Sequence, residues 1–134
     1  LKNQIGTITV PQLLLIDTRF LETLPQNEMR SGLAEMLKHG LIYDKIYWEQ
    51  FLDLTTLNFN DLDILIYRSI EIKNAIVKQD PTENGIRKAL NFGHTLGHAI
   101  ESHFLNTEKQ LLHGEAIAIG MILESYLSKQ KDHF

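Results

Sequence analysis

The chain changes its hydrophobic pattern near residue 18. Before that point, GTITVPQLLLID is rich in apolar and β-branched residues and is interrupted by one proline. Proline cannot donate a hydrogen bond within a sheet, so it divides such a stretch. The pattern predicts two short strands, Thr7 to Val10 and Leu13 to Ile16.

From residue 18 onward the periodicity becomes helical. In TLPQNEMRSGLAEMLKHGLI, Thr23 is a candidate N-cap, a proline follows in the first turn, and Gly40 or Asp44 is the expected end. Apolar residues recur at helical spacing at Met29, Leu33, Met36 and Leu37. Further helices are expected over residues 45–54, 61–79, about 89–104 and about 113–129. The chain is therefore predicted to be mainly α, with five helices after a short strand pair.

Composition and charge limit the size of the core and the kinds of partner that the chain can bind. With 134 residues and 43% hydrophobic content, the chain can bury a core as one compact domain. Its 17 acidic and 13 basic residues leave no broad cationic surface, so neither nucleic acid nor an anionic membrane is expected as a partner. The longest apolar run, AIAIGMIL, is much shorter than the roughly 20 residues of a membrane span.

The chain contains no cysteine, so any transition metal would be held by histidine and carboxylate. It also begins without methionine and stops inside a helical pattern. We therefore expect it to be part of a longer protein.

NFGHTLGHAIE sets His94 and His98 four residues apart, on one face of a helix. This spacing suits two ligands of one metal ion, but it also occurs by chance. Gly93 and Gly97 each cost a helix about 1 kcal/mol relative to alanine. Their presence indicates close approach of another backbone or of a ligand.

Glu35 lies in a mostly apolar helix, where a carboxylate needs a partner. That partner is either Lys38, in an ion pair, or a metal ion shared with two histidines. A further cluster, LLHGEA, places His113 at a helix start. No comparable context surrounds His39, His103 and His133, which are expected to be solvated or capping.

A stripe of polar residues is expected if the helix containing His94 begins near Arg87. Arg87, Asn91, His94 and His98 would then share one face. Arg87 and Lys88 fit a solvated helix start, but a guanidinium on that stripe could also clamp a carboxylate or phosphate.

Three motifs in order, GLAEMLKHGLIYD, NFGHTLGHAIE and LLHGEAIAIGM, resemble the 3-dehydroquinate synthase family over nearly the whole chain. The resemblance implies that residues 1–18 are the tail of a nucleotide-binding α/β domain. Residues 19–134 would be the helical metal- and substrate-binding domain of the dehydroquinate synthase-like fold, truncated at its C-terminus.

The resemblance also implies a zinc site, with cobalt as a possible substitute, whose ligands are Glu35, His94 and His113. His98 is then not a ligand, but contacts the substrate phosphate and helps to move protons. Catalytic roles are implied for His98, Lys38 and Asn91. The implied substrate-binding residues are Lys2, Asn3, Lys73, Arg87, Asn91 and His98. Those implied to contact NAD are Phe20, Thr23, Leu24 and Glu28, and the family's usual arginine is replaced at Asn27.

By resemblance, the activity is that of a cytoplasmic, homodimeric lyase of the shikimate pathway. Such an enzyme uses NAD to convert 3-deoxy-D-arabino-heptulosonate 7-phosphate, a sugar phosphate, to 3-dehydroquinate and phosphate. The chain alone would have little or no activity, because the nucleotide-binding domain is missing. The alternatives are a related sugar-phosphate cyclase, a metal-dependent polyol dehydrogenase, or a non-catalytic metal-binding helical module.

Overall fold

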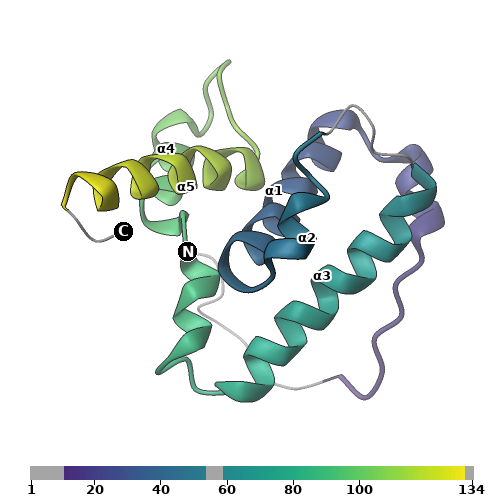
Figure 1. Ribbon diagram of the computed structural model, residues 1–134. Coiled ribbons are helices and arrows are strands. Elements are labelled where there is room, and N and C mark those ends of the chain that lie inside the picture. Colours follow the sequence, from purple (N-terminus) through teal and green to yellow (C-terminus); the bar gives the residue numbers. More distant parts are fainter. Residues whose placement is uncertain (1–10, 54–58, 132–134) are drawn as a thin grey trace.

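A computed structural model describes residues 11–53 and 59–131 (Figure 1). Within those residues the chain forms helices and coil, which confirms the mainly α prediction. Two 3-10 helices are present, η1 (Thr18–Thr23) and η2 (Ile86–Asn91). The α-helices are α1 (Gln26–Tyr43), α2 (Lys45–Glu49), α3 (Phe59–Gln79), α4 (His94–Phe104) and α5 (His113–Gln130).

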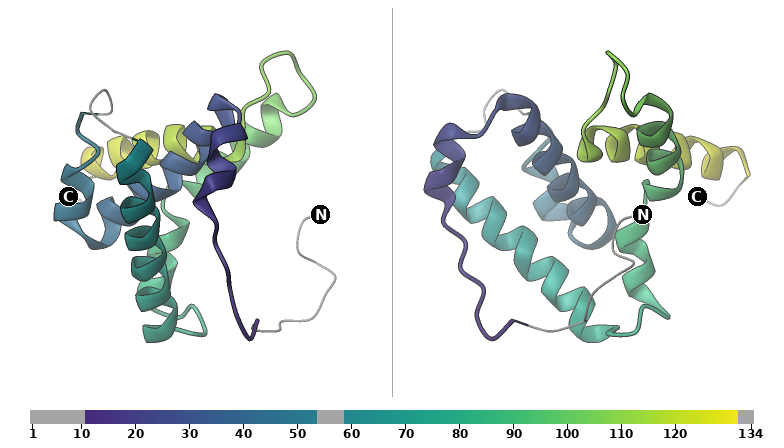
Figure 2. Two further views of the ribbon diagram at one scale, coloured as in Figure 1. Left: turned by 90° about the vertical axis from the view of Figure 1, so that its right-hand side faces the viewer. Right: turned by 180° about the vertical axis from the view of Figure 1, so that it is seen from behind.

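Helix α1 is the central element of the fold. It contacts α2, α3, η2 and α5, while α4 packs on α5. The long helix α3 therefore lies on one side of α1, and the α4–α5 pair lies on the other (Figures 1 and 2). Because α1 contacts both groups, side chains on α1 can meet residues of α3 and η2 as well as residues of α5.

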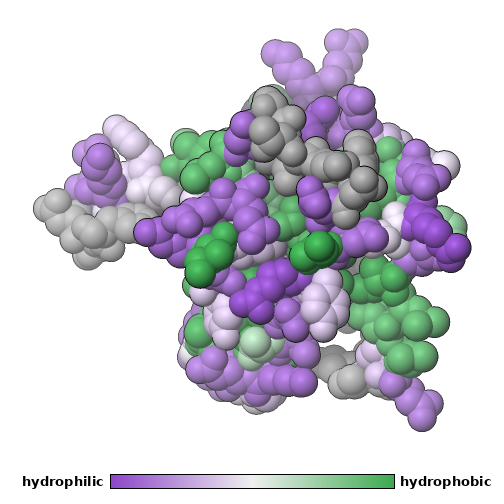
Figure 3. Space-filling model, turned by 45° about the vertical axis from the view of Figure 1, so that its right-hand side comes forward, coloured by the Kyte–Doolittle hydropathy of each residue, from purple (hydrophilic) through white to green (hydrophobic). Residues whose placement is uncertain are grey.

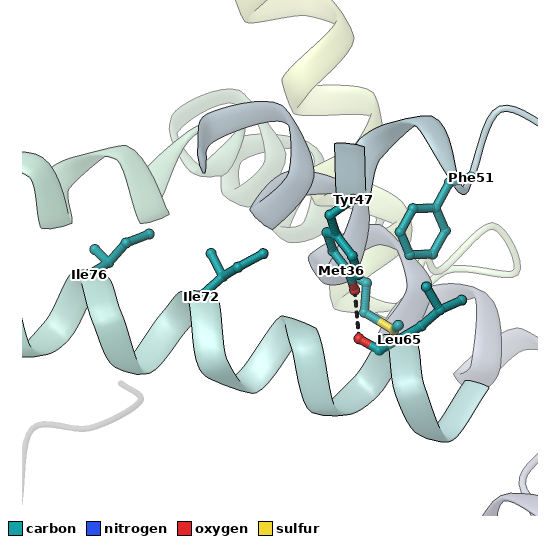
Figure 4. Packing of buried hydrophobic residues seen from close by; sticks show 6 residues of the cluster. All are labelled: Met36, Tyr47, Phe51, Leu65, Ile72 and Ile76. Carbon is teal, nitrogen blue, oxygen red and sulfur yellow. Dashed lines mark hydrogen bonds between the residues drawn. The ribbon is translucent and has the colours of Figure 1, made fainter. Parts of the chain in front are cut away.

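The main hydrophobic core holds α1, α2 and α3 together. It consists of Met36, Tyr47, Phe51, Leu65, Ile72 and Ile76 (Figure 4). The Tyr47 hydroxyl donates a 2.9 Å hydrogen bond to the Leu65 carbonyl, and burial raises the pKa of Tyr47 to about 12. The Tyr47 and Phe51 rings meet edge to face with centroids 5.0 Å apart. The hydrogen bond between Tyr47 and Leu65, inside an apolar cluster, fixes α2 against α3.

The α4–α5 pair packs backbone to backbone through glycines. A Cβ atom added at Gly120 would lie 2.0 Å from the Gly93 carbonyl oxygen and 2.7 Å from the Gly97 nitrogen. One added at Gly97 would lie 3.0 Å from the Ala116 carbonyl oxygen. The prediction that Gly93 and Gly97 mark close approach of another backbone is confirmed.

The predicted strand pair is not observed. Leu13–Ile16 is extended coil, with side chains between 52% and 83% exposed, and among the described residues no strand pairs with it. Thr7 to Val10 lies outside the described residues. A strand requires a neighbour to accept its hydrogen bonds, and a local pattern cannot supply one. Figure 3 shows hydrophobic residues open to solvent along one edge of the molecule.

Several predicted helix boundaries need correction. Helix α1 begins after Pro25, and the Thr23 hydroxyl bonds to the Phe20 carbonyl inside η1 instead of capping α1. Asp44 ends α1 as predicted, and its carboxylate caps α2 by accepting from the Tyr47 amide at 3.1 Å. The helix expected over residues 45–54 is much shorter than predicted.

The helix expected over residues 89–104 is interrupted. Residues Ile86–Asn91 form η2, and α4 starts only at His94. The break lies at Gly93, whose φ of 80° is left-handed and favours glycine over other residues. The predicted single-helix stripe from Arg87 to His98 is therefore wrong.

Candidate metal centre and adjoining pocket

Three helices bring a carboxylate and two imidazoles together. Glu35 projects from the middle of α1, while His94 and His113 are the first residues of α4 and α5. One ligand atom from each of these side chains lies within 4.8 Å of the other two. The His94 and His113 ring centroids are 5.5 Å apart, and His94 Nε2 is 4.0 Å from Glu35 Oε1.

The first turns of α4 and α5 are fixed by contacts from other helices. The Glu124 carboxylate on α5 accepts from the amides of Gly93 at 2.7 Å and Leu96 at 3.1 Å. It thus caps α4, whose own N-cap residue supplies no side-chain bond. The Gly114 amide donates to Ser31 Oγ at 2.9 Å, and a Cβ at Gly114 would lie 2.0 Å from the Ser31 carbonyl oxygen. Together these contacts fix the backbone next to His94 and His113.

The two oxygens of Glu35 have different environments. Oε2 accepts a 2.7 Å hydrogen bond from Lys38 Nζ, whose side chain is 2% exposed. Oε1 is buried and has no hydrogen-bond partner. Burial alone would raise the pKa of Glu35, but the ion pair with Lys38, with smaller contributions from His94 and His39, lowers it. The ion pair predicted as one alternative is therefore present, and it leaves an ionised oxygen free on the side of His94.

The Nδ1 contacts of His94 and His113 leave the Nε2 nitrogen of each ring available to a metal ion. His94 Nδ1 lies 3.2 Å from the Phe92 carbonyl oxygen, which can only accept a hydrogen bond. His113 Nδ1 lies 3.3 Å from Glu101 Oε2. With Nδ1 donating in both rings, each Nε2 presents a lone pair. Burial, with a further contribution from Lys38, lowers the pKa of His94, which favours the neutral form that binds metal.

These residues fit a divalent metal ion. One carboxylate oxygen and two imidazole nitrogens are a donor set that suits zinc and leaves a coordination position for another molecule. The unpartnered Glu35 oxygen is expensive in a dry protein and is explained by a cation. A second group, His98, Glu101 and His113, also satisfies the distance criterion. It contains no buried unpartnered atom, and the His98 side chain is 57% exposed.

A hollow of about 200 Å³ adjoins Glu35 and His94. Six of its lining side chains are ones that the sequence analysis named as candidates, and they come from four elements. They are Glu35, Lys38, Lys73, Arg87, Asn91 and His94. His39, Glu83 and Leu90 complete the lining. Three cationic side chains line this space against two carboxylates, Glu35 and Glu83, so the lining keeps a net positive charge that favours an anionic occupant.

The turn before η2 contributes Glu83 to the pocket lining and leads into Arg87. The Asp80 carboxylate accepts from the backbone amides of Asn84 at 3.0 Å, Gly85 at 2.7 Å and Arg87 at 3.1 Å. The Arg87 guanidinium in turn donates to the Pro81 carbonyl at 2.9 Å. Burial alone would raise the pKa of Asp80, but its amide hydrogen bonds lower it. Asp80 was missed in the sequence, where it looked like an ordinary turn residue.

Although the stripe prediction failed, three of its four residues still share a site. Asn91 Nδ2 donates to Glu83 Oε1 at 2.6 Å, next to Arg87. Both Arg87 and Asn91 line the pocket with His94, across the break at Gly93. His98 lies outside this lining, with its ring 5.3 Å from the rings of His94 and His113.

The expectation for His39 was wrong. His39 is 5% exposed, and its Nδ1 lies 2.7 Å from Ser69 Oγ. Burial, with Lys38 nearby, lowers its pKa to about 4, so the ring is neutral. His103 is exposed as expected, and its ring contacts Phe104. His133 lies outside the described residues.

The residues assigned to NAD by resemblance are open to solvent. All four are exposed; they lie on η1, on the residue that follows it and at the start of α1, and they are Phe20, Thr23, Leu24 and Glu28. Asn27 is exposed beside them. Lys2 and Asn3 lie outside the described residues. Across residues 11–53 and 59–131, no helix is long and apolar enough to span a membrane.

Comparisons with known proteins show what the chain as a whole is similar to. The family model described as 3-dehydroquinate synthase C-terminal matches residues 32–134. A protein of Streptococcus pyogenes serotype M6 named 3-dehydroquinate synthase is 51% identical over 132 residues, which are 98% of this chain and 36% of that protein. Proteins of the same name from Parabacteroides distasonis and Lactococcus lactis subsp. cremoris are each 45% identical, over 96% and 97% of this chain. The chain spans little more than a third of the length of these relatives, 37% in both of the latter.

Proposed function

We propose a function from the premise that the chain belongs to the 3-dehydroquinate synthase family, as its C-terminal domain. The chain would be the metal- and substrate-binding part of a lyase that converts 3-deoxy-D-arabino-heptulosonate 7-phosphate to 3-dehydroquinate and phosphate. The observation that carries the proposal is the unpartnered Glu35 oxygen, which faces His94 at the edge of a pocket with three cationic side chains.

Glu35, His94 and His113 would hold the metal, with zinc as the proposed ion. When bound, zinc supplies a Lewis acid that acidifies a substrate hydroxyl and polarises the ketone formed from it. The support for this assignment is the donor set and the two Nδ1 hydrogen bonds that leave each Nε2 free. Lys38, paired with Glu35 and lining the same pocket, is proposed to contact the substrate hydroxyls.

The remaining pocket residues would bind the anionic ends of the substrate. Lys73 and Arg87 are proposed to hold its carboxylate, because both line the pocket and a guanidinium and an ammonium together neutralise an anion well. Asn91 would contact the phosphate together with Lys2 and Asn3. His98 is solvent-accessible beside the metal set, which suits an imidazole that contacts the phosphate and transfers protons.

NAD would be the second cofactor. Oxidation and later reduction of the same substrate carbon regenerate it within one turnover, so the net reaction is that of a lyase. Phe20, Thr23, Leu24 and Glu28 are proposed to contact it, and their exposure leaves them accessible to such a ligand. Residues 1–18 would belong to the nucleotide-binding domain. The intact enzyme is proposed to be a cytoplasmic homodimer of the shikimate pathway.

Metal analysis of three histidine variants of the intact protein tests the assignment. His94→Ala and His113→Ala should lose zinc, whereas His98→Ala should retain zinc and lose turnover. His103→Ala, an exposed histidine on the same helix as His98, is the matched control and should retain both. Loss of zinc in the His98 variant would contradict the proposed division of roles.

A panel of candidate substrates tests the reaction itself. Lys73 and Arg87 favour a sugar phosphate with a carboxylate, so a substrate lacking the carboxylate should turn over poorly. Preference for an uncarboxylated sugar phosphate or a polyol would instead indicate a related cyclase or dehydrogenase. Turnover by the 134-residue chain alone would contradict the expected need for a nucleotide-binding domain.

A further inference from the structure

One carboxylate oxygen connects the candidate metal centre to His98. Glu101 Oε2 lies 3.1 Å from His98 Nδ1 and 3.3 Å from His113 Nδ1. His98 is one turn earlier on the same helix, whereas His113 begins the next helix. The Glu101 side chain is 30% exposed. A single oxygen at the edge of the site thus accepts from two imidazoles with different proposed roles.

This arrangement selects one tautomer in both rings. An ionised carboxylate can only accept hydrogen bonds, so each Nδ1 must carry the proton. The Nε2 atom of each neutral ring is then unprotonated. For His113, this is the nitrogen available to the metal, and for His98 it is the nitrogen available to accept a proton from a substrate group.

The same contact fixes the orientation of the His113 ring. His113 is the first residue of α5, where its backbone is held by the neighbouring Gly114 and Ser31. No other hydrogen bond to the His113 ring is present among the described residues. Glu101 is therefore the group that prevents this ring from rotating away from Glu35 and His94. A carboxylate bonded to the far nitrogen also makes an imidazole a better metal ligand.

We propose that Glu101 is a positioning residue that holds the metal ligand His113 and the substrate-facing His98 in one shared arrangement. It would act through both rings without itself binding metal or substrate. The inference rests on the proposed function for its metal, but the two hydrogen bonds can be tested without metal. Because both rings share one oxygen, loss of Glu101 should affect zinc affinity and His98 together.

The competing possibility is that Glu101 is itself a ligand, in the group with His98 and His113. The two possibilities make opposite predictions. If Glu101 positions the rings, His98→Ala retains zinc and Glu35→Gln loses it. If Glu101 is a ligand, His98→Ala loses zinc and Glu35→Gln retains it.

The first experiment records ¹⁵N NMR shifts of the histidine rings in the metal-free intact protein. In both His98 and His113, the neutral ring is expected to carry its proton on Nδ1 and to leave Nε2 unprotonated. Protonated Nε2 in either neutral ring would overturn the inference. This measurement needs no substitution, so it does not depend on whether a variant folds.

The second experiment measures zinc affinity by chelator competition, comparing Glu101→Gln with the control Glu108→Gln, which changes an exposed loop carboxylate. We expect Glu101→Gln to bind one zinc ion about 10- to 100-fold more weakly, with altered absorption of the cobalt-substituted protein. Unchanged affinity and spectrum would overturn the inference. Failure of the unsubstituted protein to bind zinc would count against the proposed function, and the NMR result would still decide the role of Glu101.

Discussion

Gly120→Ala should separate α4 from α5 and thereby disrupt the candidate metal centre. The added Cβ would lie 2.0 Å from the Gly93 carbonyl oxygen, whereas carbon and carbonyl oxygen ordinarily stay at least about 3.3 Å apart. The backbones would have to move apart by about 1 Å, because a backbone atom cannot rotate away as a flexible side chain can. Overpacking of this kind typically costs about 1–3 kcal/mol of folding free energy.

The effect on metal binding should exceed the effect on folding. Gly93 directly precedes His94, and Gly120 lies on the helix that begins with His113, so the displacement acts on two proposed ligands in opposite directions. Metal–ligand distances tolerate only about 0.2 Å. A misplacement of about 1 Å is enough to reduce turnover by roughly 100-fold. The assays are chemical denaturation of the metal-free protein and zinc titration against a competing chelator.

Gly32→Ala is the matched control. A Cβ at Gly32 meets nothing within 4 Å, and the residue lies in α1, where alanine stabilises a helix by about 0.5–1 kcal/mol relative to glycine. This variant should be slightly more stable than the parent and should bind zinc equally well. If Gly120→Ala matched the parent in both assays, the inference that backbone contact sets the ligand geometry would be refuted.

Three further perturbations test other contacts. The pKa of His39 is about 4 in the folded state, below the ordinary 6.5, so the unfolded chain binds the proton more readily between these values. The contribution of His39 to the free energy of unfolding should therefore be fully present above pH 6.5 and fall as the pH drops toward 4. Denaturation series at several pH values should show that the free energy of unfolding depends less on pH in His39→Gln than in the parent. Asp80→Asn should weaken the turn before η2, seen as faster hydrogen exchange at the amides of Asn84, Gly85 and Arg87; unchanged exchange would show that the carboxylate does not hold this turn. Glu124→Gln should destabilise the start of α4 by about 1 kcal/mol in chemical denaturation, since a charged cap is lost from a helix N-terminus; an equal loss in Glu108→Gln would show that the effect is not local.

The sequence predicted the helices well where periodicity and caps agreed. The end of α1 at Asp44 and the start of α5 at His113 follow from local residue types. The break at Gly93 was not predicted, because glycine can continue a helix or leave it, and the decision rests on the contact with Gly120. The prediction of a strand at Leu13–Ile16 failed for a similar reason, since the neighbouring strand that it requires is not specified by the local sequence.

The candidate site was predictable in its motif residues and unpredictable in its supporting contacts. Glu35 was suspected because a carboxylate in an apolar helix needs a partner, and the structure supplies that partner while leaving one oxygen free. His39 follows Lys38 directly, but its neutrality depends on burial against α3, which no local pattern reveals. Glu101 and Glu124 act across helices and looked like ordinary surface carboxylates.

The exposed extended run at Leu13–Ile16 bears on the colloidal behaviour of the protein. Four consecutive apolar side chains combine with backbone groups that have no partner among the described residues. Such a run is a template for intermolecular strand addition, the first step of ordered aggregation. Charged residues beside such a run normally oppose strand addition by repelling a second molecule. Asp17 and Arg19 carry opposite charges and pair with each other, so together they add no net charge that would do so. Self-association that increases with concentration, and is not suppressed by low salt, is the expected behaviour of this surface when nothing covers it.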